Sequence, residues 1–345
     1  MQKIRRRKDT APKRLFPSIY EYIGLCMLKI SEIPCLIIGY QRVAEVEAQI
    51  QKLYDFGIER IYVAIDGQKE GSPPKFSHSN FEALSNKNGK HISTWIRNEN
   101  LGLAASVVTA IDWFFQNEDQ GIILEDDLNF DESFLEYVAW GLPEIATRFD
   151  CLMISGNNFF PLESDGSQIQ NSWCNYPLIW GWATSRAKWQ IMRELTLKQF
   201  SWQNSKMAIE KKGFWFTGNL RAQHGLIDSW AIPLAANFYN NQYFCLLPSV
   251  ALVENRGNDH YATHTKTFRE IYAAPLEKSR FSFASSTNSD KAHLSNIQNE
   301  LIERHIFRIR KKHIFLPVYV YLQIIGIKER GPTLVDRINA VIIPS

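Results

Sequence analysis

Short apolar runs alternate with segments of helical pattern along the first third of the chain. Such runs are typical of strands buried inside a parallel sheet. The expected strands are Pro34–Tyr40, Ile61–Ile65, His91–Ile96 and Gly121–Leu124. Between them, apolar residues at helical spacing predict one helix from Val43 and another from Leu103. This alternation predicts an α/β fold, with a mostly parallel sheet and helices on both faces.

Polar residues follow the C-terminal ends of these expected strands. Right-handed crossovers bring the C-terminal ends of parallel strands to one edge of the sheet. Ligands of open α/β sheets bind in a crevice outside that edge. We therefore expect one crevice to be lined by residues 40–42, Asp66, residues 97–101 and residues 125–127.

The two ends of the chain differ from this alternating region. Residues 1–33 begin with a basic cluster that no long apolar run follows, which predicts a leader outside the main fold and neither a signal peptide nor a spanning helix. Residues 34–265 are expected to form the main domain, and residues 266–345 an extension that packs on it. Within the extension, residues 315–327 favour a core element over peripheral membrane contact.

Composition and charge narrow the possible functions. The 345 residues are 45% hydrophobic and 22% charged, which is ordinary for a globular protein of one or two domains. A net charge of +3 indicates no broad nucleic-acid-binding surface. The five cysteines are odd in number and none are paired at metal-ligand spacing, which predicts a reduced, cytoplasmic protein.

Three consecutive acidic residues, Glu125, Asp126 and Asp127, follow the fourth expected strand. Three carboxylates cannot be buried together without a cation, because like charges repel strongly at low dielectric. A hard divalent ion with oxygen ligands, Mn²⁺ or Mg²⁺ bridging a diphosphate, would balance them. The alternative is a solvated loop or a helix cap, although Asp131 and Ser133 already provide capping for the next helix.

Other crevice positions have both a ligand-binding and a structural interpretation. Asp66 can accept a hydrogen bond from a base or a ribose, or it can simply form a turn with Gly67. Arg42 can contact phosphates, hold a carboxylate in place or lie on the surface. Asn98 and Asn100 precede a helix whose first amides can face a donor, or they can cap that helix.

Three later segments carry further candidates. Tryptophan faces pack on sugar C–H surfaces, so Trp180 and Trp182 are candidate donor contacts, with core packing as the alternative. Asp228, in an expected helix over Leu220–Phe238, can deprotonate an acceptor hydroxyl or lie on the surface. His264, in a loop, can complete a metal site or form structural hydrogen bonds.

The order of these motifs resembles that of the GT-A glycosyltransferases, most of all the N-acetylglucosaminyltransferase I type and its bacterial relatives. The motifs are GYQR, AIDG, RNENLGL, ILEDDLNFDESFLEY, WGWATSRAKW, DSW and NDHYATHT. Leu124–Tyr137 is the most specific part, and the resemblance spans residues 34–265. It implies one-step, inverting transfer of a hexosyl or N-acetylhexosaminyl group from a nucleotide-diphosphate donor, favouring UDP, to a glycan or other hydroxyl acceptor in carbohydrate biosynthesis.

The resemblance also implies roles for single residues. They are Asp127 and His264 at the metal, Asp126 at the ribose, Glu125 near the donor sugar, Arg42 and Asp66 at the nucleotide, and Asp228 as general base. We add Asn100 and Trp182 as donor contacts, and we expect removal of Arg42 or Asp66 to leave the fold intact. The segment before Asp228 departs from the family pattern, so Glu254 and Asp259 are alternative bases.

Two other functions compete with this interpretation. A sugar nucleotidyltransferase shares the sheet and the acidic metal site, but it usually carries a Gly-rich, basic phosphate loop after the first strand, which GYQRVAE lacks. A carbohydrate- or nucleotide-binding protein without catalysis would keep the aromatic residues, but it has no need of the acidic triplet or of Asp228.

Overall fold

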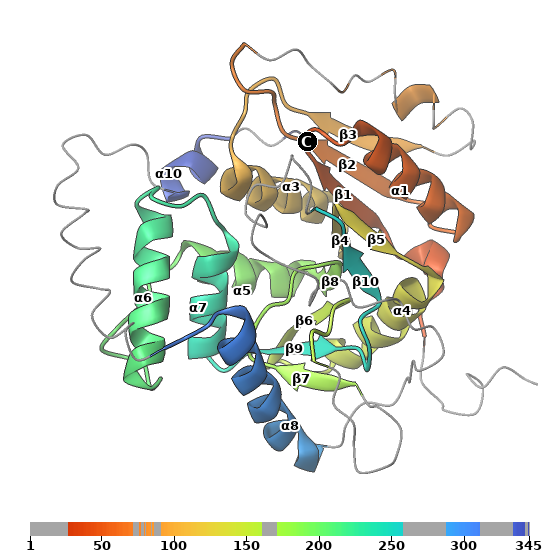
Figure 1. The fold of residues 1–345 in the computed structure, drawn as a ribbon. Helices are drawn as coiled ribbons and strands as arrows, with labels where there is room; N and C mark the ends of the chain where they lie inside the picture. The colour runs from red at the N-terminus through yellow and green to blue at the C-terminus, as the bar shows by residue number, and fades with distance from the viewer. Residues whose placement is uncertain are drawn as a thin grey trace, which may run out of the picture.

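The computed structural model describes residues 27–71, 76, 79, 81–83, 85, 91–160, 171–257, 288–310, 334–341 and 344. Its centre is an eight-stranded sheet with the order β3-β2-β1-β4-β8-β6-β9-β7 (Figure 1). The strands are β1 (Cys35–Gly39), β2 (Ile61–Ile65), β3 (Ile92–Ile96), β4 (Gln120–Glu125), β6 (Cys151–Ser155), β7 (Ser172–Cys174), β8 (Trp182–Ser185) and β9 (Phe244–Leu247). A two-stranded ribbon joins β5 (Leu128–Phe130) to β10 (Val253–Asn255).

The four strands expected from the sequence form the parallel half of the sheet. Strand β1 pairs in parallel with both β2 and β4, and β2 pairs in parallel with β3. Strand β8 then runs antiparallel to both β4 and β6, and β7 lies antiparallel to β9. The predicted α/β class with a mostly parallel sheet is therefore confirmed, and the C-terminal ends of β1 to β4 share one edge.

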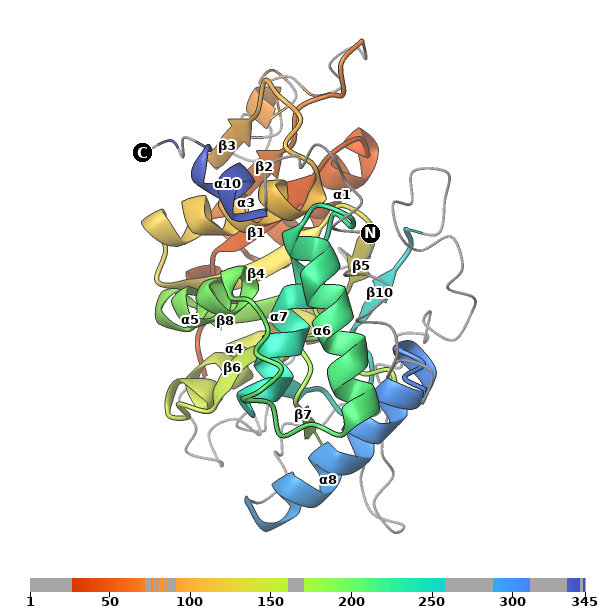
Figure 2. The same cartoon turned by 90° about the vertical axis from the view of Figure 1, so that its left-hand side faces the viewer.

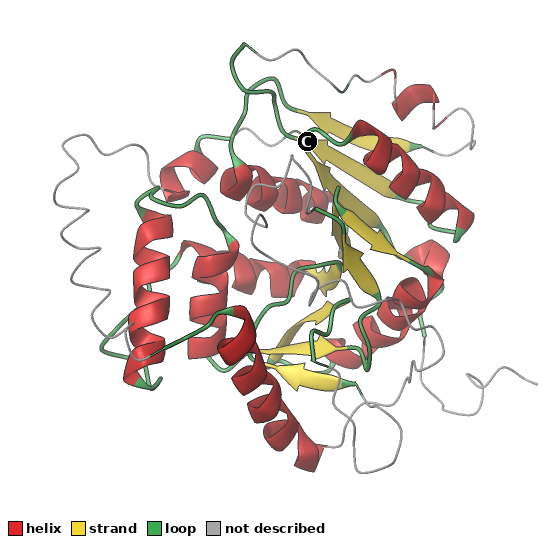
Figure 3. Ribbon diagram, in the orientation of Figure 1, coloured by secondary structure: helices red, strands yellow, loops and turns green. Residues whose placement is uncertain are grey.

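Helices cover both faces of the sheet, as predicted (Figure 3). One face packs against α1 (Val43–Asp55) and α4 (Glu132–Ala146), and their apolar side chains share one core cluster with the sheet. The other face packs against α3 (Leu103–Asn117), α5 (Arg186–Leu197) and α7 (Ala231–Asn240), and α6 (Ile209–Gln223) lies beside α7. Asp131 caps α4 as expected, accepting from the Ser133 amide at 3.1 Å.

The single helix expected over Leu220–Phe238 is wrong, because the chain turns between α6 and α7. Gly225 has a φ of 69°, in the left-handed region that commonly ends helices. The Leu226 amide donates to the Arg221 carbonyl at 2.8 Å, which closes the last turn of α6. Asp228 consequently lies in the connection before α7, and not on a helix face.

Three tryptophans join β8, α5 and α7 in the core. Trp182, Trp189 and Trp230 are at most 2% exposed. The Trp182 ring lies 6.2 Å from the Trp189 ring and 6.2 Å from the Trp230 ring, measured between centroids. Trp182 therefore packs in the core, which is the alternative role expected for it, and its contact with a donor stays a prediction.

Segments near both ends of the chain pack against the sheet and its helices. Residues 27–33, which the sequence placed in the leader, lie along α4, where the Leu28 amide donates to the Ala139 carbonyl at 3.1 Å. Helix α8 (Asn288–Leu301) contacts β7, and α10 (Leu334–Asn339) contacts α3 and α6 (Figure 2). Residues 315–327 lie outside the described residues. No helix in the described part of the chain is long and apolar enough to cross a bilayer.

The buried position of Trp182 gives a stability prediction. Trp182→Ala should lower the free energy of unfolding by about 3–5 kcal/mol, because it leaves a cavity between two other rings. Phe149→Ala is the matched control, since Phe149 is 90% exposed. It should change stability by less than about 0.5 kcal/mol. Urea unfolding followed by fluorescence measures both. Equal effects of the two substitutions would contradict the core role of Trp182.

Candidate functional site

The acidic triplet lies where β4 leaves the sheet, and the first partner of its central residue is Arg42. Asp126 Oδ1 accepts from Arg42 Nη1 at 2.8 Å, and Asp126 Oδ2 accepts from the Tyr40 amide at 2.9 Å. Both side chains of the ion pair are only 10% exposed. Because Arg42 follows β1 and Asp126 follows β4, the parallel pairing of these strands creates the contact. Of the roles open to Arg42, holding a carboxylate is the one that the contacts show.

Asp127 has one carboxylate oxygen for which the described residues provide no hydrogen-bond partner. This atom, Oδ1, is buried. The other oxygen, Oδ2, lies only 2.1 Å from where a Cβ on Gly257 would stand. The Arg256 amide donates to the Asp127 carbonyl at 2.8 Å, which continues the β5–β10 ribbon past Asn255. This ribbon therefore brings a distant segment against Asp127, and a glycine leaves room for the carboxylate.

The triplet is electrostatically crowded. Burial, followed by the charges of Asp127 and Asp126, raises the pKa of Glu125 to about 8. Burial and the charge of Asp126 raise the pKa of Asp127 to about 6, against the opposing effects of Arg42 and an Asn255 hydrogen bond. Burial also raises the pKa of Asp126. The Arg42 guanidinium thus acts against three neighbouring carboxylates, and a cation at Asp127 would relieve the remaining repulsion.

Asp127 is the side chain that fits a hard divalent ion, since its Oδ1 is an unpartnered anionic oxygen. Among the described residues, no three His, Cys, Asp or Glu side chains gather as a complete ligand set. Mg²⁺-type sites are often held by one or two carboxylates together with substrate phosphates, so one protein ligand is compatible with this chemistry. His264, expected as a second ligand, lies outside the described residues.

Asp66 and Asn100 meet at the ends of β2 and β3, but their contacts are with the protein itself. Asp66 Oδ1 accepts from the amides of Gly67 and Leu101, each at 3.0 Å. Asp66 Oδ2 accepts from Asn100 Nδ2 at 3.0 Å. Burial raises the pKa of Asp66, while the Leu101 amide and the charge of Arg97 act in the opposite direction. Asp66 therefore holds the loop before α3, and its contact with a nucleotide stays a prediction.

Arg97 also belongs to the expected crevice range, but it is directed into the interior beside α3. Its guanidinium lies 3.9 Å from the Trp95 ring centroid and donates to Ser106 Oγ at 3.2 Å and to Thr109 Oγ1 at 3.0 Å. Burial lowers the pKa of Arg97 to about 10. These contacts join β3 to α3, and no local pattern predicts them.

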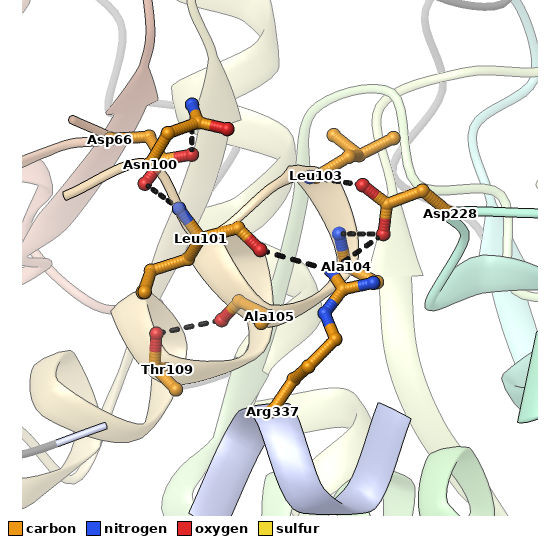
Figure 4. A network of polar contacts seen from close by, with 9 residues as sticks. All are labelled: Asp66, Asn100, Leu101, Leu103, Ala104, Ala105, Thr109, Asp228 and Arg337. Carbon is orange, nitrogen blue, oxygen red and sulfur yellow. Dashed lines mark hydrogen bonds and ion pairs between the residues drawn. The ribbon is translucent and has the colours of Figure 1, made fainter. Parts of the chain in front are cut away.

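Asp228 lies at the N-terminus of α3 (Figure 4). Its Oδ2 accepts from the Leu103 amide at 2.7 Å, and its Oδ1 accepts from the Ala104 amide at 3.2 Å and from Arg337 Nη2 at 2.8 Å. Helix α3 begins after Gly102, which has no side chain to cap it, so Asp228 supplies the capping oxygens from another part of the chain. These contacts show a structural role, while the general-base assignment stays a prediction.

Of the two alternative bases, Glu254 lies within the described residues. Glu254 accepts from Arg256 Nε at 2.9 Å and from Asn129 Nδ2 at 3.3 Å. Side chains alternate along a strand, so Glu254 lies on the opposite face of β10 from Asn255, which hydrogen bonds to Asp127. Asp259 lies outside the described residues.

Three residues at or beside this site were not predicted from the sequence: Asn255, Gly257 and Arg337. Asn255 and Gly257 reach Asp127 through a strand pairing that no local pattern reveals. Arg337 reaches Asp228 from 109 residues further along the chain. The glycine in VENRGN was the only available signal, because a glycine after a strand often allows a close approach.

Comparisons with known proteins give only distant likenesses. No protein-family model and no curated protein matches the chain. A mannosyltransferase, PcManGT from Pyrobaculum calidifontis in complex with GDP-Man and Mn²⁺, is 10% identical with a TM-score of 0.34, over 61% of this chain and 69% of its own. A UDP-glucose pyrophosphorylase complexed with UDP-glucose is 8% identical with a TM-score of 0.32, over 62% of this chain and 90% of its own.

A third solved structure is a putative glucose-1-phosphate thymidylyltransferase from Bacillus anthracis. It is 11% identical with a TM-score of 0.29, over 53% of this chain and 82% of its own. By name, the three are a mannosyltransferase, a pyrophosphorylase and a thymidylyltransferase, and none is an N-acetylglucosaminyltransferase. At these identities and TM-scores, each residue's role must be judged from this chain's own contacts.

The sequence predicts that the fold tolerates removal of Asp66, but the contacts of Asp66 predict a loss of stability. Asp66→Ala removes three hydrogen bonds to a buried carboxylate, so it should destabilise the protein by at least about 1.5–3 kcal/mol. Asp55→Ala is the control, because Asp55 is exposed and its carboxylate accepts a hydrogen bond from the Gln51 side chain at 2.9 Å. Thermal and urea unfolding measure the difference. Unchanged stability in Asp66→Ala would show that the loop is held by other contacts.

Proposed function

We propose that this chain is a metal-dependent glycosyltransferase that moves a sugar from a nucleotide-diphosphate donor, favouring a UDP-sugar, to a hydroxyl of a glycan or another acceptor. The observation that carries the proposal is the buried, unpartnered Oδ1 of Asp127 within a crowded carboxylate triplet. The triplet ends a parallel strand, at the sheet edge where α/β proteins bind ligands. A divalent cation would balance the negative charge of the triplet, and a diphosphate bound to that cation would lie at this edge of the sheet.

The chain's own residues prepare this site. Arg42 and the Tyr40 amide fix the Asp126 carboxylate, so it cannot turn away from the crevice. Gly257 has no Cβ that would clash with the Asp127 carboxylate, and this carboxylate would hold the ion. When bound, the ion would neutralise the charge that develops on the diphosphate leaving group. Asp66 and Asn100 fix the loop before α3 on the other side of β1.

The connection between β1 and α1 favours glycosyl transfer over nucleotidyl transfer. Strand β1 ends at Gly39 and α1 begins at Val43, so only residues 40–42 separate them. Two of these residues already donate hydrogen bonds to the Asp126 carboxylate, Tyr40 through its amide and Arg42 through its side chain. A Gly-rich loop that wraps a triphosphate needs more chain with free amides. The structure thus provides no such loop at the place where the competing function requires it.

The first prediction from this proposal concerns the metal. Donor hydrolysis or transfer, assayed with a panel of nucleotide sugars, should vanish with EDTA and return with Mn²⁺ or Mg²⁺. Asp127→Ala should abolish the Mn²⁺ effect, and Gly257→Ala should weaken it, because a Cβ would stand 2.1 Å from Asp127 Oδ2. Asp119→Ala is the acidic control, since its side chain is 90% exposed.

Activity that survives EDTA would remove the metal from the proposal and leave the triplet to hydrogen bond directly with the donor. Activity that produces a nucleotide sugar from a sugar phosphate would favour the nucleotidyltransferase. Binding of nucleotide sugars without turnover on any acceptor or water would favour a non-catalytic binding protein.

The second prediction concerns the general base. If Asp228 deprotonates the acceptor, one of its oxygens must give up a hydrogen bond from the protein and accept one from the acceptor hydroxyl instead. Asp228→Asn keeps an oxygen that can cap α3 but removes the proton acceptor. The turnover rate should then fall by about 10²–10⁴-fold, much more than any change in nucleotide affinity. Steady-state kinetics and calorimetry with the same protein give the two values. A loss confined to affinity would leave Asp228 with its structural role alone.

A further inference from the structure

Arg337 makes two contacts at the N-terminus of α3. Its Nη2 donates to Asp228 Oδ1 at 2.8 Å and to the Leu101 carbonyl at 3.0 Å. Asp228 in turn accepts from the first two amides of α3, those of Leu103 and Ala104. One guanidinium nitrogen thus joins the carboxylate that caps the helix to the loop that leads into it (Figure 4).

The same loop is held from its other side by Asp66. The Leu101 amide donates to Asp66 Oδ1, while the Leu101 carbonyl accepts from Arg337. Leu101 is therefore fixed between a carboxylate at the end of β2 and a guanidinium from α10. The Leu101 peptide is thus held at both its amide and its carbonyl.

The space around this junction is tightly filled. Gly102 has a φ of 75°, and a Cβ there would lie 2.6 Å from Asp228 Oδ2 and 3.0 Å from Arg337 Nη2. A glycine at this position is required both by the backbone conformation and by the two side chains. Asp228 and Arg337 are thus packed against the start of α3 and are not a loose surface pair.

Helix α10 is itself anchored, so it can present Arg337 at a fixed position. Leu334 is 2% exposed and Ile338 is 3% exposed, and both belong to the core cluster that includes α3 and α6. The Arg337 side chain is 23% exposed and that of Asp228 is 37% exposed. An ion pair this open to water contributes little to global stability. Its effect should therefore be local, on the position of the loop.

We propose that Arg337 is a positioning residue for the crevice: it fixes residues 100–104, between Asp66 and Asp228, in the arrangement that receives the nucleotide. This inference rests on the proposed function, because it assumes that the donor lies at the C-terminal edge of β1 to β4. It assigns a role to the C-terminal segment that neither the motifs nor the resemblance provides.

The experiment compares Arg337→Ala and Arg337→Lys with the wild-type chain. The control is Arg304→Ala, which removes an exposed ion pair with Glu300 on the C-terminal side of the fold. Hydrogen exchange is measured for the amides of residues 101–104, and calorimetry measures the affinity for UDP and for GDP in the presence of Mn²⁺. Thermal unfolding of each variant is recorded alongside.

Arg337→Ala should speed exchange at Leu103 and Ala104 by about three- to tenfold, as expected for local loosening without global unfolding. Nucleotide affinity should fall by a similar factor, roughly three- to tenfold, with a nearly unchanged unfolding midpoint. Arg337→Lys should recover part of both values, because it restores the charge at Asp228 but cannot reproduce the planar geometry. Arg304→Ala should change neither value.

Two results would overturn the proposal. Unchanged exchange at Leu103 and Ala104 in Arg337→Ala would show that Arg337 does not hold the helix start. Faster exchange with unchanged nucleotide affinity would show that this junction does not position the donor. If the wild-type chain binds neither nucleotide, the proposed function fails along with the donor role of Arg337, while exchange still decides whether the residue holds α3.

Discussion

Negative charge at the end of a buried strand is the constraint around which this molecule is arranged. Strand β4 runs through the apolar interior and ends in three carboxylates, which water reaches poorly and which repel one another. Burying charge at low dielectric is costly unless an opposite charge or strong hydrogen bonds accompany it. Arg42, just before α1, provides that opposite charge: it pairs directly with Asp126, and its charge also lowers the pKa of Glu125 and of Asp127. A cation at this sheet edge, as in the proposed function, would offset the remaining negative charge.

Asp126 also accepts from a backbone amide, and two carboxylates on the other side of the crevice accept from backbone amides in the same way. Asp66 organises the loop after β3, and Asp228 organises the helix that follows it. A carboxylate at a helix N-terminus is favourable because the first amides lack partners within the helix and the helix dipole attracts negative charge. Three anionic groups therefore shape the edge, but only the triplet keeps an oxygen without a protein partner in the described residues.

Local patterns were enough to predict the parallel half of the sheet. Strands β1 to β4 and helices α1 and α3 follow from apolar runs and helical spacing, and the triplet follows from its place after β4. Long-range packing explains what could not be predicted. Asn255 and Gly257 reach Asp127 only because β10 pairs with β5, between residues 125 positions apart such as Asn129 and Glu254.

Trp182 and the turn between α6 and α7 were difficult to predict from the sequence, for different reasons. Trp182 looked like a ligand contact because tryptophan suits both roles, and only tertiary packing shows that its ring is enclosed. The turn between α6 and α7 did have a local signal, since Gly225 and Pro233 mark a helix end and a helix start. Apolar residues that keep helical spacing across the turn concealed it.

The distance along the chain between Arg337 and its partners has a consequence for the order in which the molecule is built. Asp228 leaves the ribosome 109 residues before Arg337. At about 5–20 residues per second, that interval is roughly 5–20 s of synthesis. During it, the sheet and α3 can already assemble, but the helix start has only Asp228 to hold it. A nascent chain would thus acquire its fold first and its fully ordered crevice later, once α10 has docked.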